Sequence, residues 1–170
     1  MINKYSCINI YENRNKKSKL SSQILYGEKF TILKKYKDWY KIKTDYDKYV
    51  GYIKQKKFEG HIHKPTHKVS SLNAKVYSKP SKTAKVKMKL SFTSLIQVKS
   101  SNEGFFYFDN CWIQKSDVVP LNYKEKIFRR VKIFRNVKYK WGGKKFDGID
   151  CSGLIQLFYK FNNLYCPRDT

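Results

Sequence analysis

Short runs of β-branched and aromatic residues, separated by polar turns, follow one another through most of the first 119 residues. The clearest are ILYGEKFTILKKY at 24–36, WYKIKT at 39–44 and YVGYI at 49–53. Such runs favour strands, and strands at these short intervals are typical of small β-barrels rather than helical domains. We therefore predict that residues 1–60 form a small barrel.

The chain then repeats this pattern. The stretch 74–101, AKVYSKPSKTAKVKMKLSFTSLIQVKSS, again gives a short strand, a Lys/Ser/Pro loop and a long apolar strand. GFFYFDNCWIQKSDV at 104–118 is similar to WYKIKTDYDKYVGYIKQ at 39–55. A diverged internal duplication explains both similarities. We predict a second small barrel over residues 70–120, joined to the first by a linker at 61–69.

Helical spacing of apolar residues begins only after Pro120. The residues that share one face are Ile127, Val131 and Phe134. Asn122, followed three residues later by Glu125, is close to a capping box, so a helix is predicted over 122–136. A second helix is predicted from its N-cap Asp150 onwards. Its apolar residues lie on nearly all sides, so we expect it to be buried; they are Leu154, Ile155, Leu157, Phe158 and Phe161.

The net charge and the lengths of the apolar runs limit the classes of protein to which this chain can belong. The formal net charge is +24, but only five of the 37 cationic residues are Arg, and the Lys residues are spread along the chain. Nucleic-acid readers rely on clustered patches and Arg forks, so we favour a solvated basic surface over nucleic-acid binding. No run has the length of a signal peptide or a membrane span. We predict a soluble, cytoplasmic protein without membrane partners; its oligomeric state is not predicted.

Cysteines and histidines do not indicate a metal site. No CxxC occurs among the four scattered cysteines, which we expect to be reduced thiols: Cys7, Cys111, Cys151 and Cys166. The three histidines fall in the predicted linker, which itself contains no acid or cysteine: His61, His63 and His67. We predict no metal and no cofactor.

Cys151 occupies the first position of the second predicted helix. The unpaired N–H groups and the partial positive charge of a helix N-terminus favour the thiolate and can stabilise an oxyanion. Gly148 and Gly153 leave room for the backbone of a substrate. A nucleophile and a small residue packed beneath a helix start both explain this pattern, and periodicity alone does not separate them.

The motifs around Cys151 carry a family resemblance. YKWGG at 139–143, GIDCSGLIQ at 148–156 and PRDT at 167–170 resemble the signature of the NlpC/P60 cysteine peptidases. Upstream, three stretches resemble the bacterial SH3-like segments that precede such cores: LYGE (25–28), DKYVGYI (47–53) and PTHKVSSLNAKVYSKP (65–80). The resemblance implies two SH3b-like barrels, followed at 121–170 by the first two helices of a papain-like α+β peptidase domain.

The resemblance also implies an activity and site residues. Cys151 would be the nucleophile, and Tyr139 would lie near the thiolate and help form the oxyanion pocket. The substrate would be a murein stem peptide with a free N-terminal L-Ala, cut at its γ-D-glutamyl–diamino acid bond during cell-wall peptide recycling. Asp150 and Ser152 would hold the amino end of this peptide, together with Glu28 and Tyr49 of the SH3-like segment.

Such a peptidase needs a histidine base, which the family places after the cysteine. No histidine follows Cys151 in this sequence. We therefore expect the chain to be a fragment, inactive alone, without the sheet that covers the second helix in the family. The alternative is an SH3b-type binding module for a cell-wall peptide or another anionic ligand, without catalysis.

Overall fold

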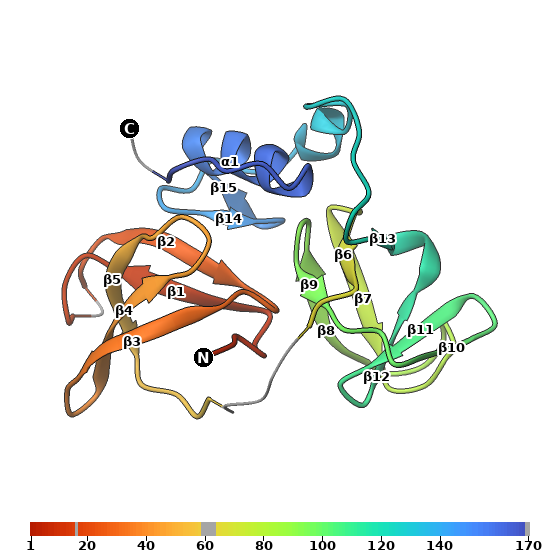
Figure 1. Cartoon of the computed structure of the whole chain (residues 1–170), viewed down its shortest axis with the longest axis horizontal. Helices are drawn as coiled ribbons and strands as arrows, with labels where there is room; N and C mark the ends of the chain where they lie inside the picture. The colour runs from red at the N-terminus through yellow and green to blue at the C-terminus, as the bar shows by residue number, and fades with distance from the viewer. Residues whose placement is uncertain (16, 59–63, 169–170) are drawn as a thin grey trace.

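The computed structural model describes residues 1–15, 17–58 and 64–168. Figure 1 shows two β bodies side by side, with one α-helix lying across their junction. The described residues form fifteen strands and one α-helix, which confirms the prediction of a mostly β chain. Within them, no helix has the length and hydropathy that crossing a membrane requires.

The first β body is a five-stranded antiparallel sheet in the order β2-β1-β5-β4-β3. Its strands are β1 (Cys7–Tyr11), β2 (Leu20–Leu25), β3 (Phe30–Lys35), β4 (Trp39–Thr44) and β5 (Val50–Lys54). Alternate residues of a strand point to the same face. The inward residues form an apolar core of Ile8, Ile10, Ile24, Phe30, Ile42 and Ile53.

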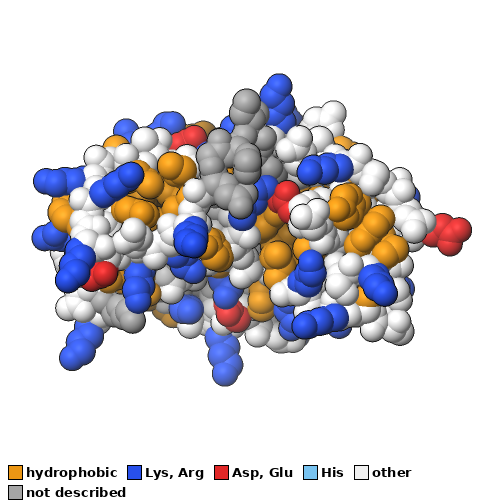
Figure 2. Space-filling view, turned by 90° about the horizontal axis from the view of Figure 1, so that it is seen from below, with side chains coloured by type: hydrophobic (Ala, Val, Ile, Leu, Met, Phe, Trp, Pro, Cys, Tyr) orange, Lys and Arg blue, Asp and Glu red, His pale blue; other side chains and the backbone are white. Residues whose placement is uncertain are grey.

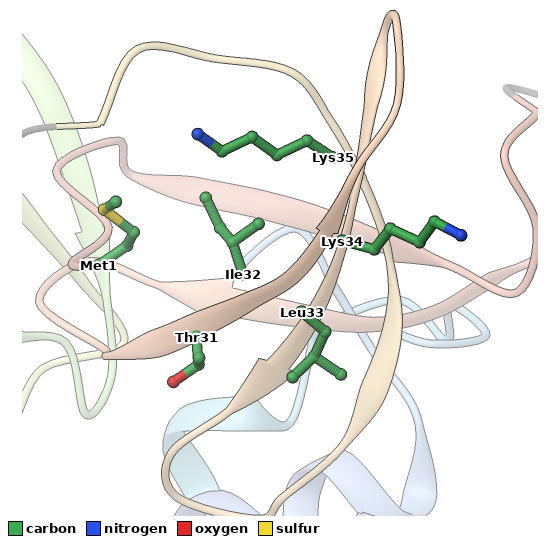
Figure 3. A pocket seen from close by; sticks show the side chains of 6 residues that line it. All are labelled: Met1, Thr31, Ile32, Leu33, Lys34 and Lys35. Carbon is green, nitrogen blue, oxygen red and sulfur yellow. The ribbon is translucent and has the colours of Figure 1, made fainter.

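One edge of this sheet is β3, beside a hollow of about 440 Å³. Figure 3 shows Thr31 and Leu33 extending to one side of β3 and Ile32 to the other. Lys34 and Lys35 place charges on the edge, which disfavours pairing with the edge of another chain. Among the described residues, no Cys, His, Asp or Glu lines this hollow, so it is not a candidate catalytic site.

The second β body contains a five-stranded sheet in the order β10-β11-β12-β7-β8. Its strands are β7 (Asn73–Tyr77), β8 (Val86–Ser91), β10 (Ser100–Asn102), β11 (Phe105–Phe108) and β12 (Cys111–Gln114). Read from its other edge, this order matches that of the first sheet, with β7 and β8 in the places of β1 and β2. The shared topology supports the internal duplication that the sequence predicts.

A three-stranded sheet in the order β13-β6-β9 completes this body. Its strands are β6 (His67–Val69), β9 (Leu95–Ile96) and β13 (Val118–Pro120), and the 3-10 turn η1 (Lys115–Asp117) precedes β13. Residues 67–69 fall in the predicted linker but form β6, because Val69 packs into the second apolar core. His61 and His63 lie outside the described residues.

The helix α1 (Cys151–Phe161) follows a short hairpin of β14 (Lys144–Lys145) and β15 (Gly148–Ile149). A third apolar cluster joins α1 to both β bodies, since Leu25 of β2 and Phe92 after β8 both belong to it. The rings of Phe92 and Phe161 stack with centroids 4.7 Å apart. The expectation of a helix buried on all sides is only half right, because Ile155 is 45% exposed.

The predicted helix over 122–136 is wrong. Only the 3-10 turn η2 (Val131–Phe134) forms there, and Phe128 has a left-handed φ of 64° that interrupts any α-helix. The expected capping box is not made either, because the Glu125 N–H donates to the Asn162 side chain (2.8 Å) and its carboxylate pairs with Arg130. Ile127 and Phe134 instead pack in the apolar cluster around α1, whereas Val131 is 40% exposed.

A buried lysine ties the second body to the end of α1. Lys68 of β6 is 1% exposed, and its ammonium donates to the carbonyl oxygens of Tyr123 (2.6 Å) and Phe161. The Phe161 oxygen lies in the last turn of α1, where a positive charge is favourable. The ammonium also lies 4.8 Å from the centroid of the Phe161 ring.

Replacing Lys68 with methionine is expected to lower the free energy of unfolding by about 2 kcal/mol, because two carbonyl oxygens lose a charged donor. Urea unfolding followed by circular dichroism measures this loss. The exposed Lys85, changed to methionine, is the matched control and should change stability by less than about 0.5 kcal/mol. Equal effects of the two substitutions would contradict the role assigned to Lys68.

Candidate active site

Cys151 is the first residue of α1, as predicted, and its side chain is exposed. The preceding Asp150 is extended (φ −102°, ψ 175°), and its carboxylate accepts from the Gly153 N–H at 2.7 Å. Asp150 is therefore the N-cap that the sequence predicts. The cysteine consequently lies where the unpaired N–H groups of the helix begin.

The segment before β14 runs beside this helix start. The Ile149 N–H donates to the Lys138 carbonyl oxygen (3.1 Å), and the Lys140 N–H donates to the Ile149 carbonyl oxygen (3.0 Å). These bonds hold the residues on either side of Lys140 next to Cys151. Tyr139 and Trp141 remain 66% and 63% exposed, so their rings are accessible at the site.

Gly142 joins this segment to the first sheet. Its φ is +70°, and a Cβ atom there would lie 2.5 Å from the carbonyl oxygen of Leu20. The Gly142 N–H also donates to Asp150 Oδ2 at 2.8 Å. Both the left-handed backbone and this close approach require glycine.

A pocket of about 320 Å³ opens at Cys151, between α1 and the first sheet. Its described lining consists of Glu12, Ser21, Tyr49, Tyr139, Trp141, Asp150, Cys151, Ser152 and Arg168. Five of the six predicted site residues therefore meet in one place, and the sixth, Glu28, does not. Their catalytic and binding roles stay predictions.

The carboxylate of Asp150 is occupied by partners from the chain itself. Arg168 binds it with two N–H groups, Nη1 to Oδ1 (2.9 Å) and Nη2 to Oδ2 (2.6 Å), and also donates to the Ser152 hydroxyl. Burial alone would raise the pKa of Asp150, but Arg168 and the N–H groups of Gly153 and Gly142 together lower it. The negative charge of Asp150 is thus neutralised by Arg168, and its carboxylate serves to cap the N-terminus of α1.

Tyr49 reaches the pocket because a polar network fixes the turn before β5. Its N–H donates to the Thr44 hydroxyl oxygen at 2.9 Å, and that hydroxyl donates to the Asp47 carboxylate. Asp47 also accepts from the side-chain amide of Gln156 on α1 (2.9 Å). This network connects the turn that carries Tyr49 to the helix that carries Cys151.

Glu28 lies elsewhere, between the first sheet and the last turn of α1. It is 8% exposed and forms a buried ion pair with Lys160, while its other oxygen accepts from the Leu25 N–H at 2.5 Å. It lines a different pocket, of about 500 Å³, with Tyr46 and Tyr165. In this position Glu28 anchors α1 to the first sheet and does not face Cys151.

Two family models match this chain. The model described as the bacterial dipeptidyl-peptidase Sh3 domain matches residues 10–58, and that of the NlpC/P60 family matches residues 136–170. The two matches support an NlpC/P60 peptidase with an N-terminal SH3-like domain. The SH3-like match includes most of the first sheet.

Curated relatives of this NlpC/P60 chain are longer than it is. A Bacillus subtilis protein named gamma-D-glutamyl-L-lysine dipeptidyl-peptidase is 26% identical over 170 residues, covering 88% of this chain and 56% of that protein. A Bacillus cereus protein of the same name is 24% identical, covering 90% of this chain and 54% of its own length. The chain therefore spans little more than half of these relatives.

The fold agrees with a solved NlpC/P60 structure. The crystal structure of a NlpC/P60 family protein from Bacillus cereus superposes with a TM-score of 0.83 at 18% identity. The match covers 99% of this chain and 74% of that one. The β bodies and α1 therefore have the arrangement found in that family member.

Sequence reasoning missed four residues that line the pocket at Cys151: Glu12, Ser21, Trp141 and Arg168. Arg168 lies in the PRDT motif and Trp141 in YKWGG, so the motifs contained a signal for both. Glu12 follows β1 without any motif, and only the folded first sheet brings it to the pocket. A carboxylate after a strand gives no sequence signal that separates it from an ordinary surface residue.

A histidine base is not found beside Cys151 within the described residues. His67 lies in β6, with its ring 4.8 Å from that of Phe106 in the second body. The described residues also contain no group of three His, Cys, Asp or Glu that could hold a metal ion. The described part of the pocket supplies a thiol, carboxylates and hydroxyls.

Acid is expected to destabilise the chain through Asp150 and Asp47. For both, burial alone would raise the pKa, but partners, chiefly Arg168 for Asp150 and Lys144 for Asp47, leave it below the ordinary 3.8. A carboxyl group whose pKa is lower in the folded than in the unfolded chain stabilises the folded state at pH values above its unfolded pKa. This stabilisation is lost as the pH falls through the folded-state pKa. The free energy of unfolding should therefore drop below about pH 4.

Urea unfolding between pH 6 and pH 3 measures this dependence. Asp150→Asn should make the fall in stability shallower, because Asn does not titrate. The exposed Asp38→Asn is the control and should leave the slope unchanged. The same slope in the wild type and in Asp150→Asn would contradict the assignment.

Proposed function

We propose that this NlpC/P60 chain supplies the nucleophile and the amino-end pocket of a cysteine peptidase acting on murein stem peptides. The bond cut is the one between γ-D-glutamate and the diamino acid, during peptide recycling in the cytoplasm. The observation that carries the proposal is that Cys151 shares its pocket with Glu12, whose exposed carboxylate has no hydrogen-bond partner within the described residues. The names of the Bacillus relatives support this class of reaction.

A free amino terminus needs an anionic partner to be held in a pocket. Asp150 is already neutralised by Arg168, and Glu28 by Lys160. Glu12 is therefore the carboxylate assigned to the ammonium group of the N-terminal L-Ala, a charge-assisted contact of about 1.5–3 kcal/mol. The hydroxyl groups of Tyr49 and Ser152 line the same pocket and can accept the remaining ammonium hydrogens.

The chemistry assigned to Cys151 is acyl transfer. Its thiolate attacks the γ-carbonyl carbon of D-glutamate, the carbonyl oxygen becomes an oxyanion, and the Cys151 N–H and Tyr139 hydroxyl donate to it. The C–N bond then breaks, and the amino group of the diamino acid leaves with one proton. Water hydrolyses the thioester, which releases L-Ala-γ-D-Glu and restores the thiol.

These proton transfers require a base, and no histidine that could serve as one lines the described part of the pocket. The three histidines of the sequence precede Cys151, and none lines the pocket within the described residues. We propose that these 170 residues bind the peptide and present the thiol without completing turnover. The same observation favours the second candidate function, a binding module for murein peptides, in which the second sheet forms a second SH3-like domain.

Protection of Cys151 from iodoacetamide tests the proposed pocket without requiring turnover. L-Ala-γ-D-Glu-L-Lys is expected to slow alkylation of Cys151 in a saturable way, whereas the N-acetylated peptide is expected to protect about tenfold less well, because it has no ammonium group. Glu12→Gln should weaken protection by the free peptide by a similar factor. Peptide mapping by mass spectrometry measures the rate at Cys151.

Glu103→Gln, an exposed change in the turn between β10 and β11, is the matched control and should leave protection unchanged. Equal protection by the free and acetylated peptides would refute the amino-end pocket. Release of lysine by the 170-residue chain would show that a base is present after all. We expect the free peptide to protect Cys151 fully from alkylation without being hydrolysed.

A further inference from the structure

A second pocket, which we call the lysine pocket, lies between the first sheet and the segment around Lys140. Its volume is about 370 Å³, and four lysines line it: Lys54, Lys56, Lys140 and Lys145. Among the described residues, it shares no lining residue with the pocket at Cys151. On the face drawn in Figure 2, Lys and Arg side chains are spread over both β bodies. In the lysine pocket, by contrast, four of them surround one cavity.

A directed chain of hydrogen bonds ends in the lysine pocket. The Lys144 N–H donates to Gln23 Oε1 (2.7 Å), Gln23 Nε2 donates to Asn9 Oδ1 (2.8 Å), and Asn9 Nδ2 donates to the Tyr11 hydroxyl oxygen (3.3 Å). The backbone donor fixes which Gln23 atom is the oxygen, and hence the direction of the chain. The Tyr11 hydroxyl accepts, so its own hydrogen remains to be donated.

The Tyr11 hydroxyl is held in place but has no acceptor within the described residues. Its ring packs edge-on against Trp39, with centroids 5.6 Å apart. Hydrogen bonds that run in one direction polarise each other, so this hydroxyl is a stronger donor than an isolated tyrosine. A fixed donor beside several ammonium groups favours a negatively charged acceptor.

The described lining contains no carboxylate that could be this acceptor. Lys145 pairs with Asp147 at 2.8 Å, but Asp147 does not line the pocket and its side chain is 49% exposed. We propose that the lysine pocket binds a small oxyanion with two or more negative charges, in the form of phosphate or carboxylate groups. The Tyr11 hydroxyl and the Lys140 ammonium group donate to its oxygens, and the other lysines of the pocket add positive charge.

This site would lie behind the residues that line the pocket at Cys151. Lys140 stands between Tyr139 and Trp141 in the sequence and is held by the bond from its N–H to Ile149. An anion held by Lys140 therefore lies on the other side of that short segment. The proposal concerns binding alone and does not depend on the proposed peptidase function.

Isothermal titration of the 170-residue chain with pyrophosphate and with tricarballylate, at constant ionic strength, tests this site. We expect saturable binding of one anion per chain. Lys140→Gln should weaken it about tenfold, and Tyr11→Phe several-fold, because each removes a donor to the charged oxygens. The anion that binds more tightly identifies the phosphate or the carboxylate class.

Lys75→Gln, an exposed change on β7, is the matched control for charge and should leave the affinity unchanged. Tyr11→Phe keeps the ring and its contact with Trp39, so it separates a specific site from diffuse attraction to a basic chain. The proposal is overturned if neither anion binds saturably. It is also overturned if Lys75→Gln and Lys140→Gln weaken binding equally while Tyr11→Phe has no effect.

Discussion

Replacing Asp150 with alanine is expected to lower the free energy of unfolding by about 3–5 kcal/mol, the usual loss when one member of a buried ion pair is removed. Asp150 and Arg168 are 8% and 2% exposed, so the substitution leaves the Arg168 guanidinium buried without its carboxylate. The N–H groups of Gly142 and Gly153 lose their acceptor as well. Urea unfolding at pH 7 measures the effect.

Asp147→Ala is the matched control for this change. Asp147 lies in the turn of the preceding β14–β15 hairpin and pairs with Lys145, but its side chain is 49% exposed, so loss of this pair should cost less than about 1 kcal/mol. The double variant Asp150→Ala/Arg168→Met should lose less free energy of unfolding than the sum of the two single variants, because it leaves neither charge buried without its partner. A loss from Asp150→Ala no larger than that from Asp147→Ala would contradict the buried pair.

Iodoacetamide is expected to modify Cys151 before the other three cysteines of the folded chain. The thiolate is the reacting species, and burial raises the pKa of Cys7 to about 12, so that only about one Cys7 thiol in 10⁴ is ionised at pH 8. Burial also raises the pKa of Cys111 and Cys166. Cys151 is exposed at the start of α1.

Cys7 should therefore react about a thousandfold more slowly than an ordinary exposed thiol. Time-resolved peptide mapping at pH 8 measures the four rates. Cys151→Ser should remove the fast phase, and in 8 M urea the four cysteines should react at similar rates because their environments are lost. Faster alkylation of Cys7 or Cys166 than of Cys151 would rule out Cys151 as the accessible nucleophile of the native chain.

The start of α1 was predictable because the relevant interactions are local. Asp150, Cys151 and Gly153 are neighbours in sequence, and an N-cap needs only the side chain of one residue and the N–H of a residue three positions later. The strands of both sheets were likewise predictable from runs of β-branched and aromatic residues. The common strand order of the two sheets follows from the duplication visible in those runs.

The errors came from contacts between distant residues. The spacing in 122–136 suits a helix, but packing against α1 and a hydrogen bond from Glu125 to Asn162 stabilise a chain of turns instead. Glu28 matched a motif, yet its partner Lys160 is 132 residues away. No local pattern indicates that such a partner exists.

By itself, the sequence determined where Cys151 would stand and which short elements would surround it, since capping and strand formation depend on adjacent residues. Only the tertiary structure decided which carboxylates keep a free charge. Arg168 neutralises Asp150 and Lys160 neutralises Glu28, whereas Glu12 reaches the pocket without a described partner. Charge pairing acts through space, so it follows the folded arrangement of the chain and not the order of its residues.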